Sequence, residues 1–334
     1  MAKINIGING FGRIGRLVAR SIFAYHGDEI NIVGINDLTD AKTLAHLFKH
    51  DSVHGRYEGD VSATESSITI DGMEIGISSE RDPAQLKWDE RGADIVVEST
   101  GLFRRREDAA KHLDAGAKKV IISAPYKGTE EVNTIVLGVN DSGIDEDTQI
   151  YSNASCTTNC LAPMVKVLDD SFGIEKAFMT TIHAYTGDQQ LVDGPHRDLR
   201  RARAAAYNVV PTTTGAAKAV GLVLPHLDGK LDGSAVRVPV PDGSLTDLTA
   251  VVNKEVTEEQ VNQAFKDAAM GGMKGIMEYS EDELVSTDIL SNPHSCIYDS
   301  KLTKTDGNLV KIIGWYDNEA GYSARTADLI TKIA

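Results

Sequence analysis

A cysteine that precedes a predicted helix is the residue of this chain best suited to nucleophilic chemistry. Cys156 lies within the segment 152–160, and Leu161, Val165 and Leu168 follow it at helical spacing. The N–H groups and the dipole at a helix N-terminus favour a thiolate, so we expect the thiol pKa to be lowered. A buried packing role is the alternative. Four polar neighbours, which a hydrophobic core would not choose, favour the nucleophile. They are Ser155, Thr157, Thr158 and Asn159.

His183 is the candidate partner of that cysteine. It lies 27 residues after Cys156, in the segment 177–185, whose composition predicts a strand. A strand that follows the nucleophile's helix could return its end to the thiol. A thiolate–imidazolium pair would then activate the cysteine, and the imidazole could move protons. A histidine satisfied within the core is the alternative, and the residues alone leave both roles open.

The chain begins with the pattern of a dinucleotide-binding turn. A predicted strand, Lys3–Asn9, leads into the Gly-x-Gly-x-x-Gly sequence Gly10–Gly15, a helical face, and a second predicted strand at 30–35. Such glycines permit a tight turn and let a pyrophosphate approach the backbone at the helix N-terminus. Asp37 lies where a carboxylate would bind the adenosine ribose hydroxyls and repel a 2′-phosphate, which favours NAD over NADP. A turn or N-cap role for Asp37 is the alternative.

Strands and helices alternate through the first half of the chain. Apolar runs at 94–100, 119–123, 134–139 and 149–152 are typical of buried parallel strands, and a short helix is predicted at 40–50. The segments 67–70 and 73–77 predict a small antiparallel addition. This alternation predicts a doubly wound parallel sheet, in which ligands bind at the carboxyl ends of the strands. We therefore expect Ser123 and Cys156 on the cofactor side.

The second half predicts a different architecture. A long irregular stretch from Thr186 to about Val210 follows the strand at 177–185, and it carries the basic run Arg200–Arg203. Loops of this length are usually functional or contact a partner. Antiparallel strands are predicted at 234–240 and 245–253. A Thr-x-x-Gln start predicts a helix over 257–270, and an amphipathic helix is predicted over 320–333.

Composition limits the functional classes. With 334 residues, 41% of them hydrophobic, the chain has room for two ordinary domains. Its net charge of −15 argues against nucleic-acid or anionic-membrane partners, so an anionic ligand needs local positive groups. Three cysteines, a start without a signal-peptide pattern and the absence of a membrane-length apolar run predict a cytoplasmic protein. His46, His50 and His54 lack a ligand cluster, and no metal site is predicted.

Five motifs resemble those of phosphorylating glyceraldehyde-3-phosphate dehydrogenases, and the similarity spans essentially the whole chain. The cysteine motif, Ala154–Asn159, is the most specific, and the others are Gly7–Arg16, Asp198–Arg203, Pro211–Lys218 and Trp315–Ser323. The resemblance implies an α/β protein with a Rossmann doubly wound parallel sheet domain, formed by residues 1–155 and the C-terminal helix 320–334. It also implies an α+β catalytic domain with a largely antiparallel sheet over residues 156–319.

The resemblance further implies a reaction of the glycolytic pathway. Cys156 matches the family's nucleophile, which attacks the aldehyde to form a thiohemiacetal. His183 matches the general base that takes the hydroxyl proton as hydride leaves for NAD. Inorganic phosphate then attacks the thioester and releases an acyl phosphate. The implied substrates are a phosphorylated aldehyde and inorganic phosphate, and the implied assembly is a homotetramer whose long loop, about Thr186 to Val210, packs at a subunit interface.

Binding residues are carried over by position in the motifs. Those matching the family's NAD contacts are Gly10, Phe11, Gly12, Arg13, Ile14, Asp37, Arg81, Ser123 and Asn318. Those matching its site for the substrate's own phosphate are Thr186 and Arg237. Those matching its site for inorganic phosphate are Ser155, Thr157, Thr214 and Gly215, with Arg201 contributing to anion binding. Arginine forks and hydroxyl donors suit phosphate oxygens.

Three other functions compete with this one. Erythrose-4-phosphate dehydrogenase resembles the same family but releases a free acid by hydrolysis. A cofactor-free cysteine hydrolase or acyl-transferase would use Cys156 and His183, yet it would leave Gly10–Gly15 and Asp37 without a purpose. A non-catalytic interaction protein with the same fold is the third, and the presence of both Cys156 and His183 argues against it.

Overall fold

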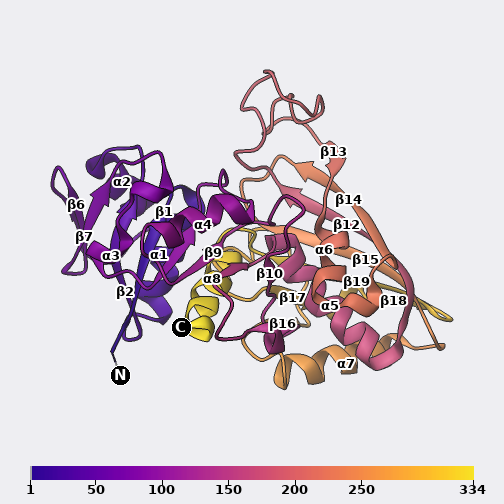
Figure 1. Cartoon of the computed structure of the whole chain (residues 1–334). Helices are drawn as coiled ribbons and strands as arrows, with labels where there is room; N and C mark the ends of the chain where they lie inside the picture. Colours follow the sequence, from indigo (N-terminus) through magenta and orange to yellow (C-terminus); the bar gives the residue numbers. More distant parts are fainter. Residues whose placement is uncertain (1) are drawn as a thin grey trace. The chain divides into compact units, whose positions relative to one another are not determined.

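The computed structural model describes residues 2–334, which separate into two compact units (Figure 1). The first unit contains the chain up to Ile135, then Ser142–Ala154 and Ser323–Ala334. The second unit contains Val136–Asp141 and Ser155–Tyr322. Each is built around its own sheet and is described separately.

A nine-stranded sheet forms the centre of the first unit, in the order β10-β11-β9-β8-β1-β2-β7-β6-β5. All neighbours from β10 to β7 pair in parallel, and only β7-β6 and β6-β5 pair antiparallel. The strands are β1 (Ile4–Asn9), β2 (Ile30–Asn36), β5 (Val61–Ala63), β6 (Ser67–Ile70), β7 (Met73–Ser78), β8 (Ile95–Glu98), β9 (Lys119–Ile122), β10 (Asn133–Thr134) and β11 (Ile150–Ser152). A separate small hairpin is formed by β3 (His50–Asp51) and β4 (Gly55–Arg56).

Strand β1 is the point at which the strand order of this sheet reverses. The chain moves from β1 to β2 on one side, and later returns to place β8 on the other side of β1. A crevice therefore opens at the carboxyl ends of β1, β2 and β8, where doubly wound sheets bind their ligands. The predicted parallel Rossmann sheet is confirmed, and its helices are α1 (Arg13–Tyr25), α2 (Ala41–Lys49), α3 (Trp88–Arg91), α4 (Arg106–Asp114) and most of α8 (Ala320–Ile333).

The strand predicted over 134–139 is wrong beyond its first residue. Strand β10 ends at Thr134, and the following residues turn instead of extending the sheet. The Val136 N–H donates to Asn140 Oδ1 at 2.8 Å, and Gly138 adopts a φ of 82° that a strand cannot contain. Ile135, Val136 and Leu137 are buried, and the chain passes to the second unit at Val136, so burial rather than strand pairing explains the apolar composition.

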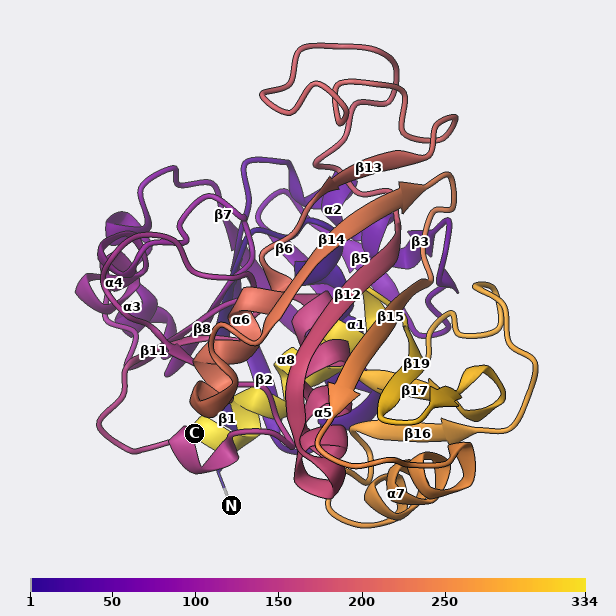
Figure 2. The same ribbon diagram turned by 90° about the vertical axis from the view of Figure 1, so that its right-hand side faces the viewer.

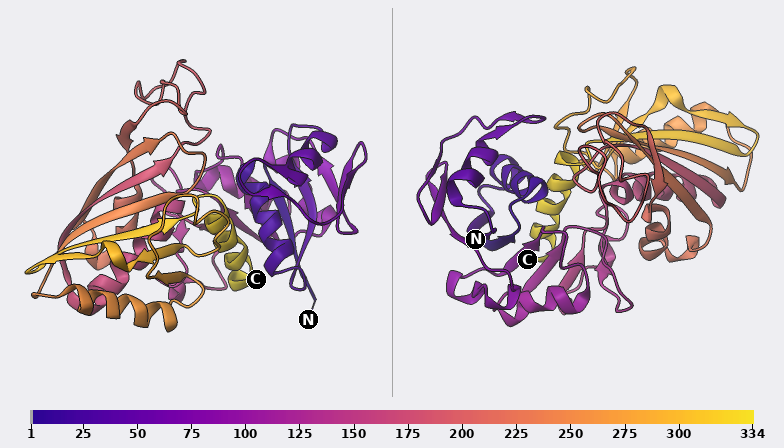
Figure 3. Two further views of the ribbon diagram at one scale, coloured as in Figure 1. Left: turned by 180° about the vertical axis from the view of Figure 1, so that it is seen from behind. Right: turned by 90° about the horizontal axis from the view of Figure 1, so that it is seen from above.

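The second unit has a mixed sheet in the order β13-β14-β12-β15-β19-β17-β16, and β18 pairs with β19. Pairs β12-β14 and β16-β17 are parallel and the others are antiparallel, which confirms the predicted largely antiparallel sheet. The twist of this sheet is visible from behind (Figure 3). The strands are β12 (Ile174–Ala184), β13 (Val210–Thr213), β14 (Leu231–Val238), β15 (Ser244–Val252), β16 (Met277–Ser280), β17 (Cys296–Asp299), β18 (Lys304–Asp306) and β19 (Leu309–Tyr316).

Helices α5 (Cys156–Phe172), α6 (Ala216–Val223) and α7 (Glu258–Met270) pack together on this sheet (Figure 2). The capping box predicted for α7 is present, since Thr257 and Gln260 exchange side-chain and backbone hydrogen bonds. The predicted strands near 234–240 and 245–253 also exist and run antiparallel. They do not form a hairpin, however, because β12 lies between β14 and β15 and pairs with both.

The residues between β12 and β13, 185–209, contain no helix or strand, as the sequence predicts. This loop extends beyond the edge strand β13 (Figure 2). Its large apolar side chains are exposed, with Tyr207 88% and Leu191 81% accessible. Apolar side chains exposed together in this way are typical of a surface that contacts a partner. Across residues 2–334, no helix combines the length and the apolar character needed to cross a membrane.

Candidate functional site

In the glycine-rich turn after β1, two glycines lie close against neighbouring backbone atoms and the third faces open space. Gly10 has a φ of 89°, and a Cβ there would lie 2.7 Å from the Thr100 backbone nitrogen. A Cβ on Gly15 would lie 2.1 Å from the Gly10 carbonyl oxygen. A Cβ on Gly12 would meet no atom of residues 2–334 within 4 Å. Gly12 also precedes α1 without a side-chain cap, so backbone at this helix N-terminus faces open space suited to an anion.

A cavity of about 360 Å³ lies beside this turn, at the carboxyl ends of β1, β2 and β8. Asp37 stands on its wall. One carboxylate oxygen of Asp37 accepts the Phe11 N–H at 2.8 Å and the other accepts the Thr39 N–H at 2.9 Å. The strand end that carries Asp37 is thereby tied to the glycine turn. The residues that line the cavity include Asn9, Gly10, Gly12, Asn36, Asp37, Glu80, Arg81, Ser99 and Thr100.

The other predicted cofactor residues divide between the two units. Phe11 is fully buried at the turn, and Ile14 lies in the first turn of α1. Arg13 directs its guanidinium to the Asp51 carboxylate at 3.1 and 3.2 Å. Ser123 follows β9 at the carboxyl edge of the sheet, as predicted. Asn318 belongs to the second unit, where its Oδ1 accepts the Ser244 hydroxyl at 2.5 Å.

Cys156 and His183 are brought together in the second unit. Cys156 is the first residue of α5, and Ser155 caps this helix by accepting the Thr158 N–H at 3.0 Å. His183 lies one residue before the end of β12, which is the next element along the chain. The Cys156 Sγ and His183 Nε2 atoms are 3.5 Å apart. A nucleophile and a base at this distance form the pair that covalent catalysis requires.

Arg237 lies beside His183 on the neighbouring strand, because the two residues are paired in the parallel β12-β14 register. Its Nη1 lies 2.9 Å from His183 Nδ1 and 3.0 Å from the Ala184 carbonyl oxygen. His183 Nδ1 itself lies 2.7 Å from that carbonyl, the shorter contact. A protonated Nδ1 that donates to Ala184 leaves the Nε2 lone pair facing the thiol, which is the tautomer a base requires.

The pKa of the Cys156 thiol is shifted in the direction opposite to the prediction. Burial raises the pKa of the Cys156 thiol to about 11, although the Arg237 charge and a hydrogen bond from the Thr157 N–H act to lower it. Burial, and then the Arg237 charge, lower the pKa of His183 to about 3. The predicted lowered thiol pKa is therefore wrong for the protein without ligands, because loss of hydration outweighs the helix N-terminus.

Donors for anions surround this pair. Arg237 Nη1 also reaches Thr186 Oγ1 at 3.4 Å, and the buried Arg237 Nε has no hydrogen-bond partner among residues 2–334. Arg201 is held by Asp188, by Thr212 Oγ1 at 2.9 Å and by the Thr213 carbonyl at 3.0 Å. Its charge also lowers the pKa of His183. Arg201 is therefore anchored at the end of β13, within electrostatic range of the pair.

Two helix N-termini supply the remaining predicted phosphate residues. Ser155 and Thr157 lie at the start of α5. Gly215 is the N-cap residue of α6, and Thr214 before it accepts the Ala216 N–H at 3.2 Å. The N-termini of both helices suit an anion, because backbone N–H groups and the helix dipoles favour negative charge there.

Sequence reasoning missed Tyr316 and Asp188. The Tyr316 hydroxyl lies 2.8 Å from both Thr157 Oγ1 and Thr181 Oγ1, so it connects the first turn of α5 to β12. Its ring contacts His183 edge-on, with centroids 5.8 Å apart. Asp188 pairs with Arg201. Tyr316 lies in the motif Trp315–Ser323 and Asp188 in the long loop after Thr186, but only the tertiary contacts reveal what they touch.

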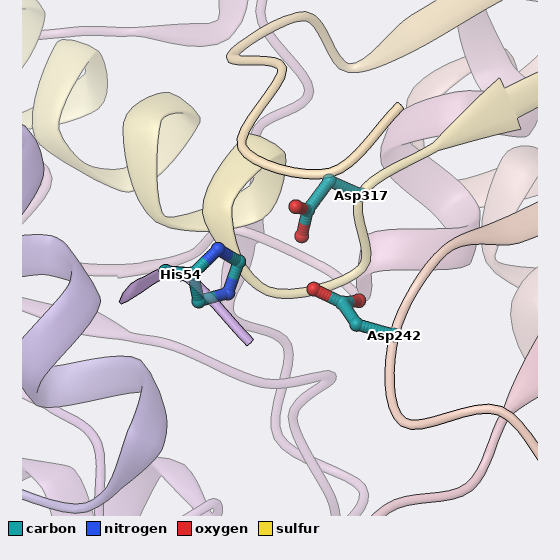
Figure 4. Close-up of side chains that lie close together, drawn as sticks. All are labelled: His54, Asp242 and Asp317. Atoms are coloured by element: carbon teal, nitrogen blue, oxygen red, sulfur yellow. The ribbon is translucent and has the colours of Figure 1, made fainter. Parts of the chain in front are cut away.

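Asp317, the neighbour of Asn318 in the sequence, forms a buried pair of carboxyl groups with Asp242. Asp317 precedes α8 and accepts backbone N–H groups from Ser291, Glu319 and Ala320 at 2.7–2.9 Å. Asp242 approaches Asp317 from the turn before β15 (Figure 4), and the two carboxyl groups share a hydrogen bond. Burial and then the Asp317 charge raise the pKa of Asp242 to about 9. Asp242 therefore keeps its proton near neutral pH.

Replacing Asp242 by asparagine is expected to raise thermal stability at pH 8. In the unfolded chain a carboxyl titrates near pH 3.9, so between about pH 4 and pH 9 the folded protein retains a proton that the unfolded chain releases. Stability of the wild type accordingly falls as pH rises through this range. Asparagine cannot ionise and still donates to Asp317, so the melting temperature of Asp242→Asn should exceed that of the wild type by several degrees at pH 8.

Thermal melts at pH 5, 6, 7 and 8 measure this difference. The gain should shrink toward pH 5, and the matched change Asp282→Asn, at an exposed aspartate, should show no such trend. A gain of equal size at all four pH values would contradict the assignment of the proton to Asp242.

Comparisons with known proteins give matches in both halves of the chain. Residues 4–106 match the family model described as glyceraldehyde 3-phosphate dehydrogenase, NAD binding domain, and residues 155–318 match its C-terminal domain. A glyceraldehyde-3-phosphate dehydrogenase of Priestia megaterium is 58% identical over 333 residues, covering 99% of this chain and 98% of the relative. Glyceraldehyde-3-phosphate dehydrogenase 1 of Bacillus subtilis is 57% identical with the same coverage. A Streptomyces coelicolor relative of the same name is 58% identical over 329 residues, covering 98% and 97%.

Proposed function

Because this chain belongs to the glyceraldehyde-3-phosphate dehydrogenase family, we propose that it oxidises D-glyceraldehyde 3-phosphate with NAD and inorganic phosphate to 1,3-bisphosphoglycerate. Its cofactor is NAD, since residues 4–106 match the NAD-binding domain of the family. The observation that carries the proposal is the 3.5 Å approach of Cys156 Sγ to His183 Nε2 beside Arg237. A thiol, a base and a cation at one point suit the oxidation of a phosphorylated aldehyde.

Cys156 and His183 have complementary roles in this proposal. The Cys156 sulfur attacks the aldehyde carbon as its proton passes to His183 Nε2. His183 then returns that proton to the aldehyde oxygen, which completes the thiohemiacetal and leaves Nε2 free. His183 then accepts the hydroxyl proton of that adduct while the carbon loses a hydride, so a thioester remains on Cys156. NAD, when bound, supplies the hydride acceptor. Burial, and then the Arg237 charge, lower the pKa of His183, which favours an unprotonated Nε2 that can accept the thiol proton.

Two anion sites follow from the donors around the pair. We assign the substrate's own phosphate to Arg237 and Thr186, and the buried unpaired Nε of Arg237 supports this assignment. A buried donor without a partner is costly, and a bound phosphate oxygen would satisfy it. We assign inorganic phosphate, which cleaves the thioester, to a second set of residues. They are Ser155, Thr157, Thr214 and Gly215, with Arg201 adding positive charge.

The first unit fits a dinucleotide on this chain's own geometry. The open space over Gly12 leaves room for a pyrophosphate against the backbone of Arg13 and Ile14, at the end of a cavity of about 360 Å³. The Asp37 carboxylate on the cavity wall suits ribose hydroxyls and repels a 2′-phosphate. We assign Gly10, Phe11, Arg81 and Ser123 to the same cofactor and Asn318 to its nicotinamide carboxamide.

We further propose a cytoplasmic homotetramer that acts in glycolysis, with residues 1–155 and 320–334 as the cofactor domain and 156–319 as the catalytic domain. Exposed apolar side chains on the loop 185–209, among them Leu191, Leu199 and Tyr207, support a protein partner there, and an identical subunit would cover them. An odd number of cysteines suits a reducing compartment.

The proposal is tested by the rate of NADH formation from NAD and glyceraldehyde 3-phosphate, with phosphate or with sulfate at equal ionic strength. We expect fast turnover that requires phosphate, because the thioester has no other efficient acceptor. Turnover indifferent to phosphate would indicate a hydrolysing dehydrogenase, and erythrose 4-phosphate would be the next substrate. Failure to bind NAD would favour a cofactor-free cysteine hydrolase.

A further inference from the structure

A chain of hydrogen-bonded side chains, all of them buried except that of Thr100, runs through the first unit from Trp88 to the cofactor cavity. Glu98, at the end of β8, is its centre and is only 2% exposed. It stands in an apolar strand where a carboxylate without partners would be strongly unfavourable. The members of the chain are Trp88, His112, Glu98, Asn9, Asn36 and Thr100.

Glu98 accepts four hydrogen bonds. Its Oε2 lies 2.6 Å from Asn9 Nδ2 and 3.0 Å from His112 Nε2. Its Oε1 accepts the Thr100 N–H at 2.8 Å and the Thr100 hydroxyl. The Trp88 indole N–H can only donate, and it donates to His112 Nδ1 at 3.0 Å. A neutral His112 must therefore carry its proton on Nε2 and donate it to Glu98.

The carboxylate also sets the direction of the hydrogen bonds toward the cavity. Because Asn9 donates its amide to Glu98, its Oδ1 is left to accept Asn36 Nδ2 at 2.8 Å. Asn36 then holds the backbone of Glu80 from both sides, at 2.9 Å to its carbonyl and 2.8 Å to its N–H. Asn9, Asn36, Glu80, Arg81 and Thr100 all line the cavity. The ends of β1, β2 and β8 and the segment after β7 are thus joined through one carboxylate.

We propose that Glu98 is a positioning residue for the dinucleotide cofactor: it does not line the cavity, but it orients Asn9, Asn36 and Thr100, which do. The proposal rests on the assignment of this cavity to NAD. An amide at position 98 would present N–H groups either to Asn9 and His112 or to Thr100, all of which are donors. If the Asn9 side chain rotated so that its Oδ1 accepted from the amide at position 98, its Nδ2 group would face the Nδ2 group of Asn36. Two donors would then face each other at the cavity wall.

The experiment compares Glu98→Gln with the wild type by calorimetric titration of NAD and by steady-state kinetics. We expect the NAD Kd and KM to rise about tenfold, which corresponds to about 1.4 kcal/mol, while kcat at saturating NAD stays within about twofold. The matched control is Asn31→Ala. Asn31 makes a similar amide pair with Asn5 at 3.1 Å, on the same two strands but far from the cavity, and its loss should leave the Kd unchanged.

A double variant tests the direction of the hydrogen bonds in this chain by comparison with Glu98→Gln. When Glu98→Gln is combined with Asn9→Asp, the amide introduced at position 98 faces an acceptor at position 9, and that acceptor can still accept from Asn36. Where the amide nitrogen at position 98 faces His112 in both variants, the loss of the His112 acceptor cancels in the comparison. We expect the double variant to bind NAD several-fold more tightly than Glu98→Gln.

Either of two results would overturn the inference. One is a Kd of Glu98→Gln equal to that of the wild type, and the other is a double variant that binds no more tightly than Glu98→Gln. A wild type that fails to bind NAD would instead refute the assignment of the cavity, and this inference with it.

Discussion

Replacing Cys156 by serine is expected to lower kcat by roughly 10³-fold or more while NAD affinity stays within about twofold. A hydroxyl is a far weaker nucleophile than a thiol and would give an ester in place of the thioester. Cys156 begins α5 in the second unit, whereas the cavity assigned to NAD lies in the first. The loss should therefore fall on the chemical step and leave cofactor binding intact.

Stopped-flow and steady-state NADH formation, with NAD titration in parallel, measure this effect. The control is Cys160→Ala, one helical turn further along α5. Cys160 is fully buried, with its Sγ 3.5 Å from the Gly314 carbonyl oxygen, so its removal should lower thermal stability and leave most of kcat. Substantial turnover by Cys156→Ser would refute the thioester mechanism.

Replacing His183 by asparagine is expected to lower kcat by about 10²- to 10⁴-fold, the usual contribution of a general base. His183 Nε2 is the proton acceptor 3.5 Å from the Cys156 sulfur. Since burial raises the thiol pKa to about 11, few thiols are ionised at neutral pH without such an acceptor. Alkylation of Cys156 by iodoacetamide at pH 7 should slow for the same reason.

The matched control for this change is His226→Asn. His226 is exposed and pairs with Asp169 at 2.7 Å, so it resembles His183 in type and differs in place. Its replacement should leave both kcat and the alkylation rate near the wild-type values. Equal alkylation rates in His183→Asn and the wild type would show that the imidazole does not take the thiol proton.

Local sequence determined the elements that begin and end on short signals. The glycine turn after β1, the helix that starts at Cys156, the capping box of α7 and the terminal helix α8 all lie where the sequence predicts them. Such elements are set by backbone sterics, caps and periodicity, which act over a few residues. The alternation of strands and helices was likewise sufficient to predict the doubly wound sheet.

Tertiary structure decided what these elements meet. Strand β12 lies between β14 and β15, and the β12-β14 pairing places Arg237 beside His183. After Thr134 the chain leaves the first sheet, and Val136–Asp141 belongs to the second unit. Tertiary structure also reversed the predicted pKa shift of Cys156, because burial outweighs the helix N-terminus. The chain of contacts through Glu98 spans residues 89 positions apart. Contacts between distant residues and loss of hydration depend on the complete packing, and no local pattern encodes them.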